Sequence, residues 1–427
     1  MLNLLGSKLS FCDGLNRRNF LKIGAFGAGL ALSDMLRLKA QASAAPGSRP
    51  STQKAAIMIY LGGGPSHIDM YDLKPDAPEE YRGEFRPIQT NVNGVQICEH
   101  MPRQARMMDK LAVIRSLVSV GEHSDSECMT GYSENVNRVA GHPSFGSVVS
   151  RVRGGNDLPP FISLRGMSTG CEPGFLGISH RAFTPDGPSL SNLRLNGVTP
   201  ERVGERRGLL QQFDTVRRDI DGRGTMAGLD TFTERAFDMI SSGTTRQALD
   251  LSREDQRTRD RYRGVEQFLT ARRLIEAGVG CVTLGYGGWD THSQNFITLR
   301  RQLPELDRGI ATLIQDLHDR GMQDDVVTVC WGEFGRTPRV GDSTADGRGH
   351  WPQAMSAMIA GGGLRMGQVI GSTNARGELP RDRRYYPAQV LSTIYRAIGI
   401  DPSMTFPNNN GRPMYIQDNR EPVSELV

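Results

Sequence analysis

The sequence has few cysteines, no long hydrophobic run and no large excess of charge of one sign. Six cysteines occur in 427 residues, none of them in a Cys-x-x-Cys pair, and Cys12 lies in the N-terminal leader region. The other five, an odd number, indicate neither a disulfide scaffold nor a zinc knuckle. The net charge is +4 and the arginines are scattered, so no nucleic-acid surface is indicated. No later segment approaches 18 apolar residues, so no stable membrane span is expected.

Two nucleotide-binding motifs are also absent. Residues 62–67, Gly-Gly-Gly-Pro-Ser-His, lack both the Gly-Lys-Ser/Thr ending of a phosphate-binding loop and the spacing of a dinucleotide fingerprint. Three glycines after a predicted strand either let the backbone approach a ligand closely or simply form a tight turn. In the first case Ser66, His67 and Asp69 lie at the edge of a sheet. We therefore predict that Ser66 and His67 bind substrate.

The first 45 residues are predicted to be a targeting segment. Residues 16–22, Asn-Arg-Arg-Asn-Phe-Leu-Lys, have the paired arginines and the following Phe-Leu-Lys of a twin-arginine export signal. A short apolar stretch follows, and residues 40–42 and 42–44 both offer small-x-small cleavage sites. A frayed amphipathic N-terminus is the alternative. Residues 46–427 are then predicted to be one periplasmic or secreted domain, delivered by the twin-arginine export machinery.

Buried strands alternate with helices in the rest of the chain. A stripe of leucines and isoleucines predicts a long helix over residues 296–320, and a helical insertion is predicted over about 199–278. This alternation favours an α/β fold, a three-layer sandwich with a mostly parallel central sheet. The predicted strands span residues 55–61, 111–115, 161–164, 279–286, 326–329 and 356–360, and a last helix spans 387–398.

Two of these strands end in loops that carry polar and charged side chains. The strand at 279–286 leads into residues 287–292, Gly-Gly-Trp-Asp-Thr-His. The strand at 326–329 leads into Glu333 and Arg336. Ligands of open α/β sheets bind at the carboxyl ends of the strands, so these side chains are expected to converge.

Three side chains are predicted to bind a metal ion. Asp290 and His292 offer a carboxylate oxygen and an imidazole two residues apart. His350 lies in a glycine-rich loop, where a structural histidine has little core to fill, whereas His318 is predicted to lie on the surface of the long helix. Such a set suits Zn²⁺, with Mn²⁺ or Fe²⁺ as alternatives. In the competing interpretation, Asp290 caps the helix that follows.

A serine pair lies at the start of another predicted helix, in residues 123–127, His-Ser-Asp-Ser-Glu. A hydroxyl of Ser124 or Ser126 would lie there beside free backbone N–H groups and the positive end of the helix dipole. That place suits a nucleophile that attacks an anionic ester, and it suits an N-cap equally well. His123 is predicted to bind substrate.

Four motifs together resemble a known family. They are residues 63–69 (Gly-Gly-Pro-Ser-His-Ile-Asp), 287–292, 332–338 (Gly-Glu-Phe-Gly-Arg-Thr-Pro) and 347–352 (Gly-Arg-Gly-His-Trp-Pro). They are similar to motifs of a family of twin-arginine-exported bacterial proteins, often labelled a domain of unknown function or, loosely, sulfatases. The resemblance covers essentially the whole mature chain.

That family is in turn distantly similar to the alkaline phosphatase and sulfatase superfamily, and the resemblance therefore implies an alkaline phosphatase-like fold. The superfamily uses metal ions at the carboxyl edge of the sheet. With them it cleaves phosphate or sulfate esters through a Ser, Thr or Cys nucleophile.

Carried over residue by residue, this resemblance is partial. Asp290, His292 and His350 are similar to the Asp/His/His set that holds one superfamily metal, with a shorter Asp-to-His spacing. Glu333-Phe334-Gly stands where the superfamily has Asp-His-Gly, so Glu333 can still ligate a metal and Phe334 cannot. The first-strand Asp that binds the second metal is missing, and so is the Cys/Ser-x-Pro-x-Arg signature of the sulfatases.

The residues and the resemblance together predict an exported metal-dependent hydrolase of phosphate or sulfate esters, acting on a small-molecule or polysaccharide ester. One divalent ion is predicted, Zn²⁺ before Mn²⁺, Ca²⁺ or Mg²⁺, and a second ion is left open. Ser124 is the predicted nucleophile, with Ser66 and Ser126 as alternatives, and Arg336 would stabilise charge on the transferred group. Two other functions stay open. One is a non-catalytic binding protein that has lost part of the metal site, and the other is a lyase or mutase of sulfated or phosphorylated polysaccharide.

Export is the first testable prediction. Replacing both Arg17 and Arg18 with lysine should trap the precursor inside the cell, because the twin-arginine machinery reads the arginine pair. Cell fractionation and immunoblotting measure this, and the mature wild-type chain should begin near Ser43 or Ala45. Normal export of the double-lysine variant would contradict the prediction.

Overall fold

The structure, a computed structural model, describes residues 54–154, 158–185 and 243–427. The predicted export signal at 1–45 and residues 199–242 of the predicted helical insertion lie outside the described residues. Residues 243–278 contain four short helices separated by turns, and the insertion itself stays a prediction.

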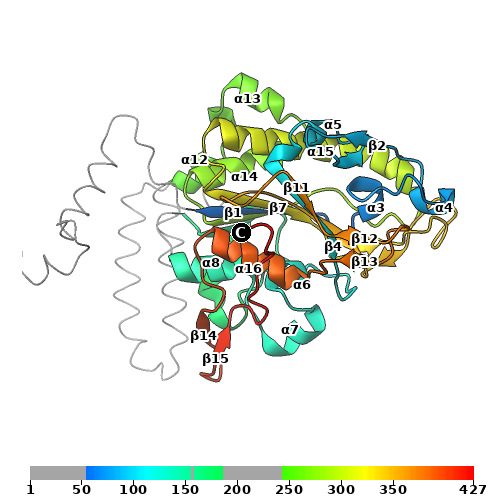
Figure 1. The fold of residues 1–427 in the computed structure, drawn as a ribbon. Coiled ribbons are helices and arrows are strands. Elements are labelled where there is room, and N and C mark those ends of the chain that lie inside the picture. The colour runs from blue at the N-terminus through cyan, green and yellow to red at the C-terminus, as the bar shows by residue number, and fades with distance from the viewer. Residues whose placement is uncertain (1–53, 155–157, 186–242) are drawn as a thin grey trace, which may run out of the picture. The chain divides into compact units, whose positions relative to one another are not determined.

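A seven-stranded sheet lies at the centre of the described part of the chain (Figure 1). Its strand order is β11-β4-β10-β7-β1-β6-β5, and β10 alone runs antiparallel to the others. The predicted mostly parallel sheet is therefore confirmed. The strands are β1 (Ala55–Tyr60), β4 (Leu111–Leu117), β5 (Phe161–Ser163), β6 (Cys281–Gly285), β7 (Val326–Trp331), β10 (Met355–Gly361) and β11 (Gln368–Ile370).

Strand β1 lies in the interior of this sheet, between β6 and β7, and all six of its residues are buried. Its side chains alternate between the two faces, as in any strand. Ile57 and Ile59 belong to one hydrophobic cluster, and Met58 and Tyr60 belong to another. A strand that is buried on both faces needs a continuous apolar run, which is why the sequence shows no alternation of apolar and polar residues there.

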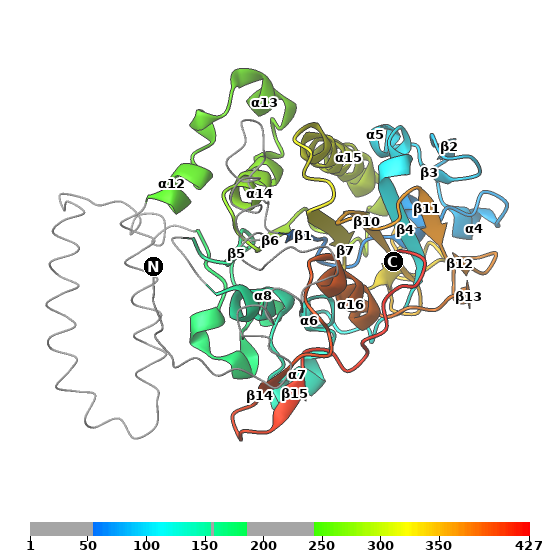
Figure 2. The same cartoon turned by 60° about the vertical axis from the view of Figure 1, so that its left-hand side comes forward.

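Helices cover both faces of the sheet, as Figure 1 and Figure 2 show. α14 (Glu266–Glu276) and α15 (Asn295–Asp319) pack in the cluster that contains Ile57. α8 (Phe145–Arg153) and α16 (Pro387–Ala397) pack in the cluster that contains Met58. The predicted three-layer arrangement is confirmed. The other α-helices are α3 (His67–Met70), α4 (Glu79–Arg82), α5 (Pro102–Ala105), α6 (Ser126–Thr130), α7 (Glu134–Ala140), α12 (Thr244–Leu249) and α13 (Gln256–Arg261).

The direction of β10 decides what lies at the carboxyl edge of the sheet. Because β10 is antiparallel to β4 and β7, its first residues lie where those two strands end. The chain reaches that edge through a short hairpin of β8 (Gly335–Arg336) and β9 (His350–Trp351). Loops after β4, β6 and β7 and the segment before β10 therefore meet at one edge. Three other hairpins are β2 (Pro87–Gln89) with β3 (Gln96–Cys98), β12 (Ser372–Thr373) with β13 (Pro380–Asp382), and β14 (Thr405–Pro407) with β15 (Pro413–Tyr415).

The cysteines of the described chain are buried and free, in agreement with the absence of a predicted disulfide scaffold. They are Cys98, Cys128, Cys171, Cys281 and Cys330. Within the described ranges, no helix is both long enough and apolar enough to cross a membrane.

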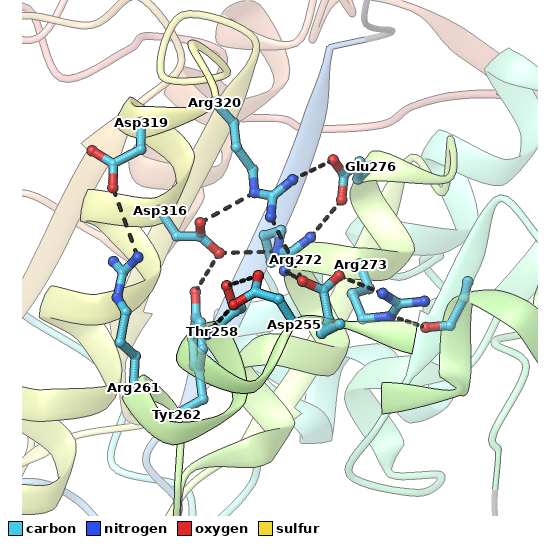
Figure 3. A network of polar contacts seen from close by, with 12 residues as sticks. Asp255, Thr258, Arg261, Tyr262, Arg272, Arg273, Glu276, Asp316, Asp319 and Arg320 are labelled. Atoms are coloured by element: carbon cyan, nitrogen blue, oxygen red, sulfur yellow. Dashed lines mark hydrogen bonds and ion pairs between the residues drawn. The ribbon is translucent and has the colours of Figure 1, made fainter. Parts of the chain in front are cut away.

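A buried ion network joins α14 to α15 (Figure 3). Arg272 of α14 is fully buried, and its guanidinium lies 2.9 Å from Glu254 and 3.0 Å from Asp316 of α15. Asp316 also accepts a hydrogen bond of 3.0 Å from the Tyr262 hydroxyl and pairs with Arg320 at 3.1 Å. Removing one partner from a buried pair leaves an uncompensated charge. The network therefore holds these two helices in one arrangement.

Replacing Arg272 with alanine should lower the free energy of unfolding by about 3–5 kcal/mol, because Asp316 stays buried, loses its buried cation and keeps only the partly exposed Arg320. Chemical denaturation measures this change. Arg261→Ala is the matched control, since Arg261 and Asp319 are 3.8 Å apart and 35% and 51% exposed. Loss of such an exposed pair should cost less than about 1 kcal/mol. Equal losses in the two variants would contradict a buried network.

The stability difference between Arg272→Ala and the wild type should also depend on pH. Burial alone would raise the pKa of Glu254, but hydrogen bonds and charges of Arg272 and Arg273 outweigh it and lower the pKa below the ordinary 4.5. A carboxyl with a lowered folded-state pKa contributes stability that is present above the unfolded-state pKa and lost as pH falls through the folded-state pKa. The difference should therefore be largest near pH 7 and shrink below about pH 4.

Candidate metal centre

Four segments bring acidic and imidazole side chains to the carboxyl edge of the sheet. His123 follows β4, and Glu333 follows β7. Asp290 and His292 follow β6. His350 lies in β9, just before the antiparallel β10. These five side chains form the candidate metal centre, and the convergence predicted for two strand ends extends to all four segments.

Asp290 lies at the centre of this cluster. Its Oδ1 is 3.0 Å from Nε2 of His350 and 3.1 Å from Nε2 of His292. The two Nε2 atoms are themselves 2.9 Å apart, and Oδ2 of Asp290 is 3.6 Å from Nε2 of His123. The interpretation of Asp290 as a helix cap is wrong, because α15 has Gln294 as its N-cap. One carboxylate and the Nε2 atoms of three imidazoles thus face one small region.

The spacing of these atoms fits a divalent transition-metal ion. Three atoms about 3 Å apart share a point about 2.1 Å from each, which is the length of a metal–nitrogen or metal–oxygen bond. His123, Asp290 and His350 also offer ligand atoms that all lie within 4.8 Å of one another. Burial lowers the pKa of His350 in spite of its hydrogen bond to Asp290, so the imidazole is neutral and able to ligate.

Two of the imidazoles have a polar partner at Nδ1, the nitrogen that points away from the cluster. Nδ1 of His123 lies 3.1 Å from Oε1 of Glu333, and Nδ1 of His292 lies 3.1 Å from the Ser343 hydroxyl. Metal-ligating histidines bind such a partner through their second nitrogen, which fixes the ring and leaves Nε2 free for the ion. Glu333, predicted as a ligand, is 2% exposed, and its Oε1 also accepts a hydrogen bond of 2.8 Å from the Gly63 amide. In the structure, Glu333 therefore contacts the Nδ1 atom of His123 and lies on the side of that ring away from Asp290.

Phe334 forms one wall of the centre. Its ring centroid lies 4.4 Å from that of His350 and 5.5 Å from that of His123, and the side chain is fully buried. Gly64, with φ of +80°, lies against the same ring, and a Cβ atom there would come within 2.4 Å of it. Phe334 therefore packs against two imidazoles of the candidate metal centre.

Arg336, predicted to stabilise a transferred group, is fully buried. Its guanidinium donates to the carbonyl oxygens of Gly64 at 2.9 Å and Arg348 at 3.0 Å, and it pairs with Asp290. Burial alone would raise the pKa of Asp290, but hydrogen bonds from Arg336 and His350 hold it well below its usual range. Arg336 therefore keeps Asp290 ionised and joins three loops, in a place that does not suit direct contact with substrate.

A second buried guanidinium, which the sequence analysis missed, holds the segment before β10. Arg348 and Asp69 are both fully buried and pair at 2.8 and 2.9 Å. The Ser66 hydroxyl donates to Asp69 at 2.6 Å, and Nε2 of His67 lies 2.8 Å from the Gly377 carbonyl. Ser66 and His67 are each 1% exposed, so both predicted substrate-binding residues are committed to internal hydrogen bonds.

Ser124, the predicted nucleophile, lies in the turn before α6. Its hydroxyl accepts a hydrogen bond of 3.2 Å from the Ser126 amide. The N-cap residue of α6 is Asp125, whose side chain makes no capping hydrogen bond. Ser126 is fully buried, and its hydroxyl donates to the Tyr132 carbonyl at 3.0 Å. These bonds support a capping role for Ser124, and its role as nucleophile stays a prediction.

Residues 53–427 match the family model described as "Protein of unknown function (DUF1501)". The chain belongs to this family. The match covers the sheet, both helical layers and all five side chains of the candidate metal centre. A search of curated proteins found no match for the chain. Twin-arginine export stays a prediction.

Solved structures include distant similarities to this DUF1501 protein. The PsFucS1 sulfatase from Pseudoalteromonas sp. is 14% identical, with a TM-score of 0.40, over 86% of this chain and 70% of that one. A protein in the alkaline phosphatase superfamily from Vibrio parahaemolyticus is 10% identical, with a TM-score of 0.36, over 87% and 76%. The C-terminal periplasmic domain of EcEptC from Escherichia coli, in complex with Zn, is 9% identical, with a TM-score of 0.36, over 87% and 88%. Similarities this distant carry no conclusion about the activity of the chain.

The geometry of the candidate metal centre predicts metal binding. Asp290→Ala and His350→Ala should each lower the affinity for Zn²⁺, used as the probe ion, by more than 100-fold, because each removes a ligand atom at the centre of the cluster. Ser343→Ala should lower it by about 10–100-fold, the usual effect of losing a residue that orients a ligand, because the Ser343 hydroxyl lies 3.1 Å from Nδ1 of His292. Competition with a chromogenic chelator measures all three affinities.

The matched control for this prediction is His318→Gln, which removes a partly exposed imidazole on α15. Its affinity for Zn²⁺ should equal that of the wild type. Tight binding that survives in both Asp290→Ala and His350→Ala would show that the ion is held elsewhere.

Proposed function

We propose that this protein is an exported metal-dependent hydrolase of phosphate or sulfate esters. The observation that carries the proposal is the meeting of Asp290 with the Nε2 atoms of His292 and His350 at the carboxyl edge of the sheet. Ligands of open α/β sheets bind at this edge. The ester class follows from the motifs that resemble the phosphatase and sulfatase superfamily.

Asp290, His292 and His350 would hold the ion, and Zn²⁺ is the ion that such a set of nitrogen and oxygen donors suits best. When bound, Zn²⁺ would polarise the ester oxygen and favour the ionised form of an attacking oxygen. Arg336 would act as a positioning residue, since it keeps the Asp290 carboxylate ionised and in place. The rest of the proposed chemistry is assigned to side chains of the protein.

His123 is the proposed proton-transfer residue. It is the imidazole farthest from Asp290, at 3.6 Å, and its side chain is 52% exposed. Buried Glu333 lies 3.1 Å from its Nδ1 and would orient the ring. Nε2 would then be free to give a proton to the leaving oxygen of the ester.

Ser124 is the proposed nucleophile. The two alternatives, Ser66 and Ser126, are 1% and 0% exposed, whereas Ser124 is partly exposed. Ser124 is also the direct chain neighbour of His123. To attack an ester, its hydroxyl would have to leave the Ser126 amide, which donates to it in the structure.

That hydrogen bond favours a second candidate function. A binding protein on the same fold would use the candidate metal centre to hold an anionic ligand without turning it over. The buried position of Arg336 agrees with this alternative, because a fully buried guanidinium is not available to stabilise charge on a transferred group. Turnover is the property that separates the two functions.

Replacing Ser124 with alanine should abolish turnover of aryl phosphate or aryl sulfate esters and leave zinc content unchanged, if the hydroxyl is the nucleophile. The matched control is Ser133→Ala, which removes the hydroxyl that accepts from the Val136 amide at the start of α7. That variant should lose about 0.5–2 kcal/mol of stability and keep its activity.

Two results would count against this assignment. Full turnover with a lowered melting temperature in Ser124→Ala would leave Ser124 as a cap. Absence of turnover in zinc-loaded wild-type protein on every ester tested would favour the binding protein.

A further inference from the structure

A cavity lined by arginines lies in the helical layer that contains α15. Its volume is about 640 Å³, and it is open to solvent on one side, lined by the segment before β4, α13 and α15. Its cationic lining residues are Arg103, Arg106, Lys110, Arg261 and Arg308. Only two carboxylates, Asp109 and Asp260, face the same space, so the lining has an excess of three positive charges.

Two of these cations have no ion-pair partner within the described ranges. The side chains of Arg106 and Arg308 form no ion pair with described residues, and Nε of Arg308 is buried without a hydrogen-bond partner there. The other three have partners: Arg103 lies near the buried carboxylate of Asp307, Arg261 pairs with Asp319 at 3.8 Å, and Lys110 donates to Gln315 at 2.7 Å. Of the two carboxylates, Asp260 pairs with the exposed Arg263, and Asp109 accepts a hydrogen bond of 2.5 Å from the neutral amide of Asn91, which also lines the cavity. The cavity therefore has more cationic donors than the described chain uses.

This cavity is separate from the candidate metal centre. Lys110 immediately precedes β4, at the amino end of that strand, whereas His123 follows its carboxyl end. Along α15, Arg308 lies about 20 Å from the first residue, Asn295, at 1.5 Å per residue. The two places are at opposite edges of the sheet.

We propose that this cavity binds a multivalent oxyanion, that is, a molecule that carries two or more sulfate or phosphate groups. Planar guanidinium groups donate paired hydrogen bonds to such groups, and arginine is the residue that suits this recognition best. Unpaired cations gathered around one space repel one another, and a bound anion removes that cost. A volume of about 640 Å³ is within the range of small-molecule sites and exceeds what one inorganic ion fills.

Isothermal titration calorimetry of the protein without added zinc tests the proposal, with tripolyphosphate, a sulfated tetrasaccharide and its unsulfated counterpart as probes, because tripolyphosphate chelates Zn²⁺ and a zinc-loaded centre would bind anions as well. We expect at least one of the two anions to bind with a stoichiometry of one, and the unsulfated sugar not to bind. The comparison of the two anions shows whether phosphate or sulfate is the group recognised. Binding should weaken as salt is added, because the attraction is between partly exposed charges.

Variants locate the binding. Arg106→Gln combined with Arg308→Gln should weaken binding of the preferred anion at least tenfold, and Asp260→Asn should strengthen it. Arg381→Gln, a matched control on exposed β13, should bind as the wild type does. His350→Ala should also bind as the wild type does, which separates this cavity from the metal centre and from the proposed hydrolase activity.

Three results would overturn the proposal. They are no binding of either anion by the wild type at low salt, equal weakening in Arg381→Gln and in the double variant, or loss of binding in His350→Ala alone. Circular dichroism of the double variant shows whether it is folded. If it is not folded, the strengthening expected for Asp260→Asn decides the question.

Discussion

The buried guanidinium of Arg336 holds together the loops on which the candidate metal centre depends. It donates to the carbonyls of Gly64 and Arg348 and pairs with Asp290, so it joins the loops after β1, β6 and β7 to the segment before β10. A buried cation that loses such acceptors costs several kcal/mol. Separating the loops would therefore cost several kcal/mol of free energy. The Asp290 carboxylate is also kept ionised. The buried pair of Arg348 and Asp69 has a similar effect on the segment that carries the last imidazole.

The fold was largely predictable because the burial of its central strands and of α15 leaves clear apolar patterns in the sequence. The apolar runs of β1 and β7 and the leucine stripe of α15 were located to within one or two residues. The direction of β10 was not predicted, since an apolar run reads the same whichever way the strand points. The short hairpin of β8 and β9 was also missed, because two-residue strands leave no periodic pattern.

The location of the candidate site was predicted better than the roles of its individual residues. Asp290 and His350 come together as expected, because strand ends of one sheet meet at one edge. Arg336 was predicted to face substrate because its glycine-flanked motif is typical of an exposed loop. Its burial depends on the carbonyl group of Gly64, 272 residues away in the chain, as well as that of Arg348, and no local pattern contains the first of these contacts. The pairing of Glu333 with His123 spans a similar distance in sequence, and only the fold brings the two together.

The account's central claim is that Asp290, His292 and His350 hold one divalent ion at the carboxyl edge of the sheet. Anomalous diffraction at the zinc absorption edge, from crystals grown with zinc, tests it most directly. The account predicts one peak about 2.0–2.2 Å from a carboxylate oxygen of Asp290 and from Nε2 of both histidines. A strong peak elsewhere in the molecule would contradict it. So would an absence of any peak at saturating zinc, with the two imidazoles still 2.9 Å apart as they are in this structure.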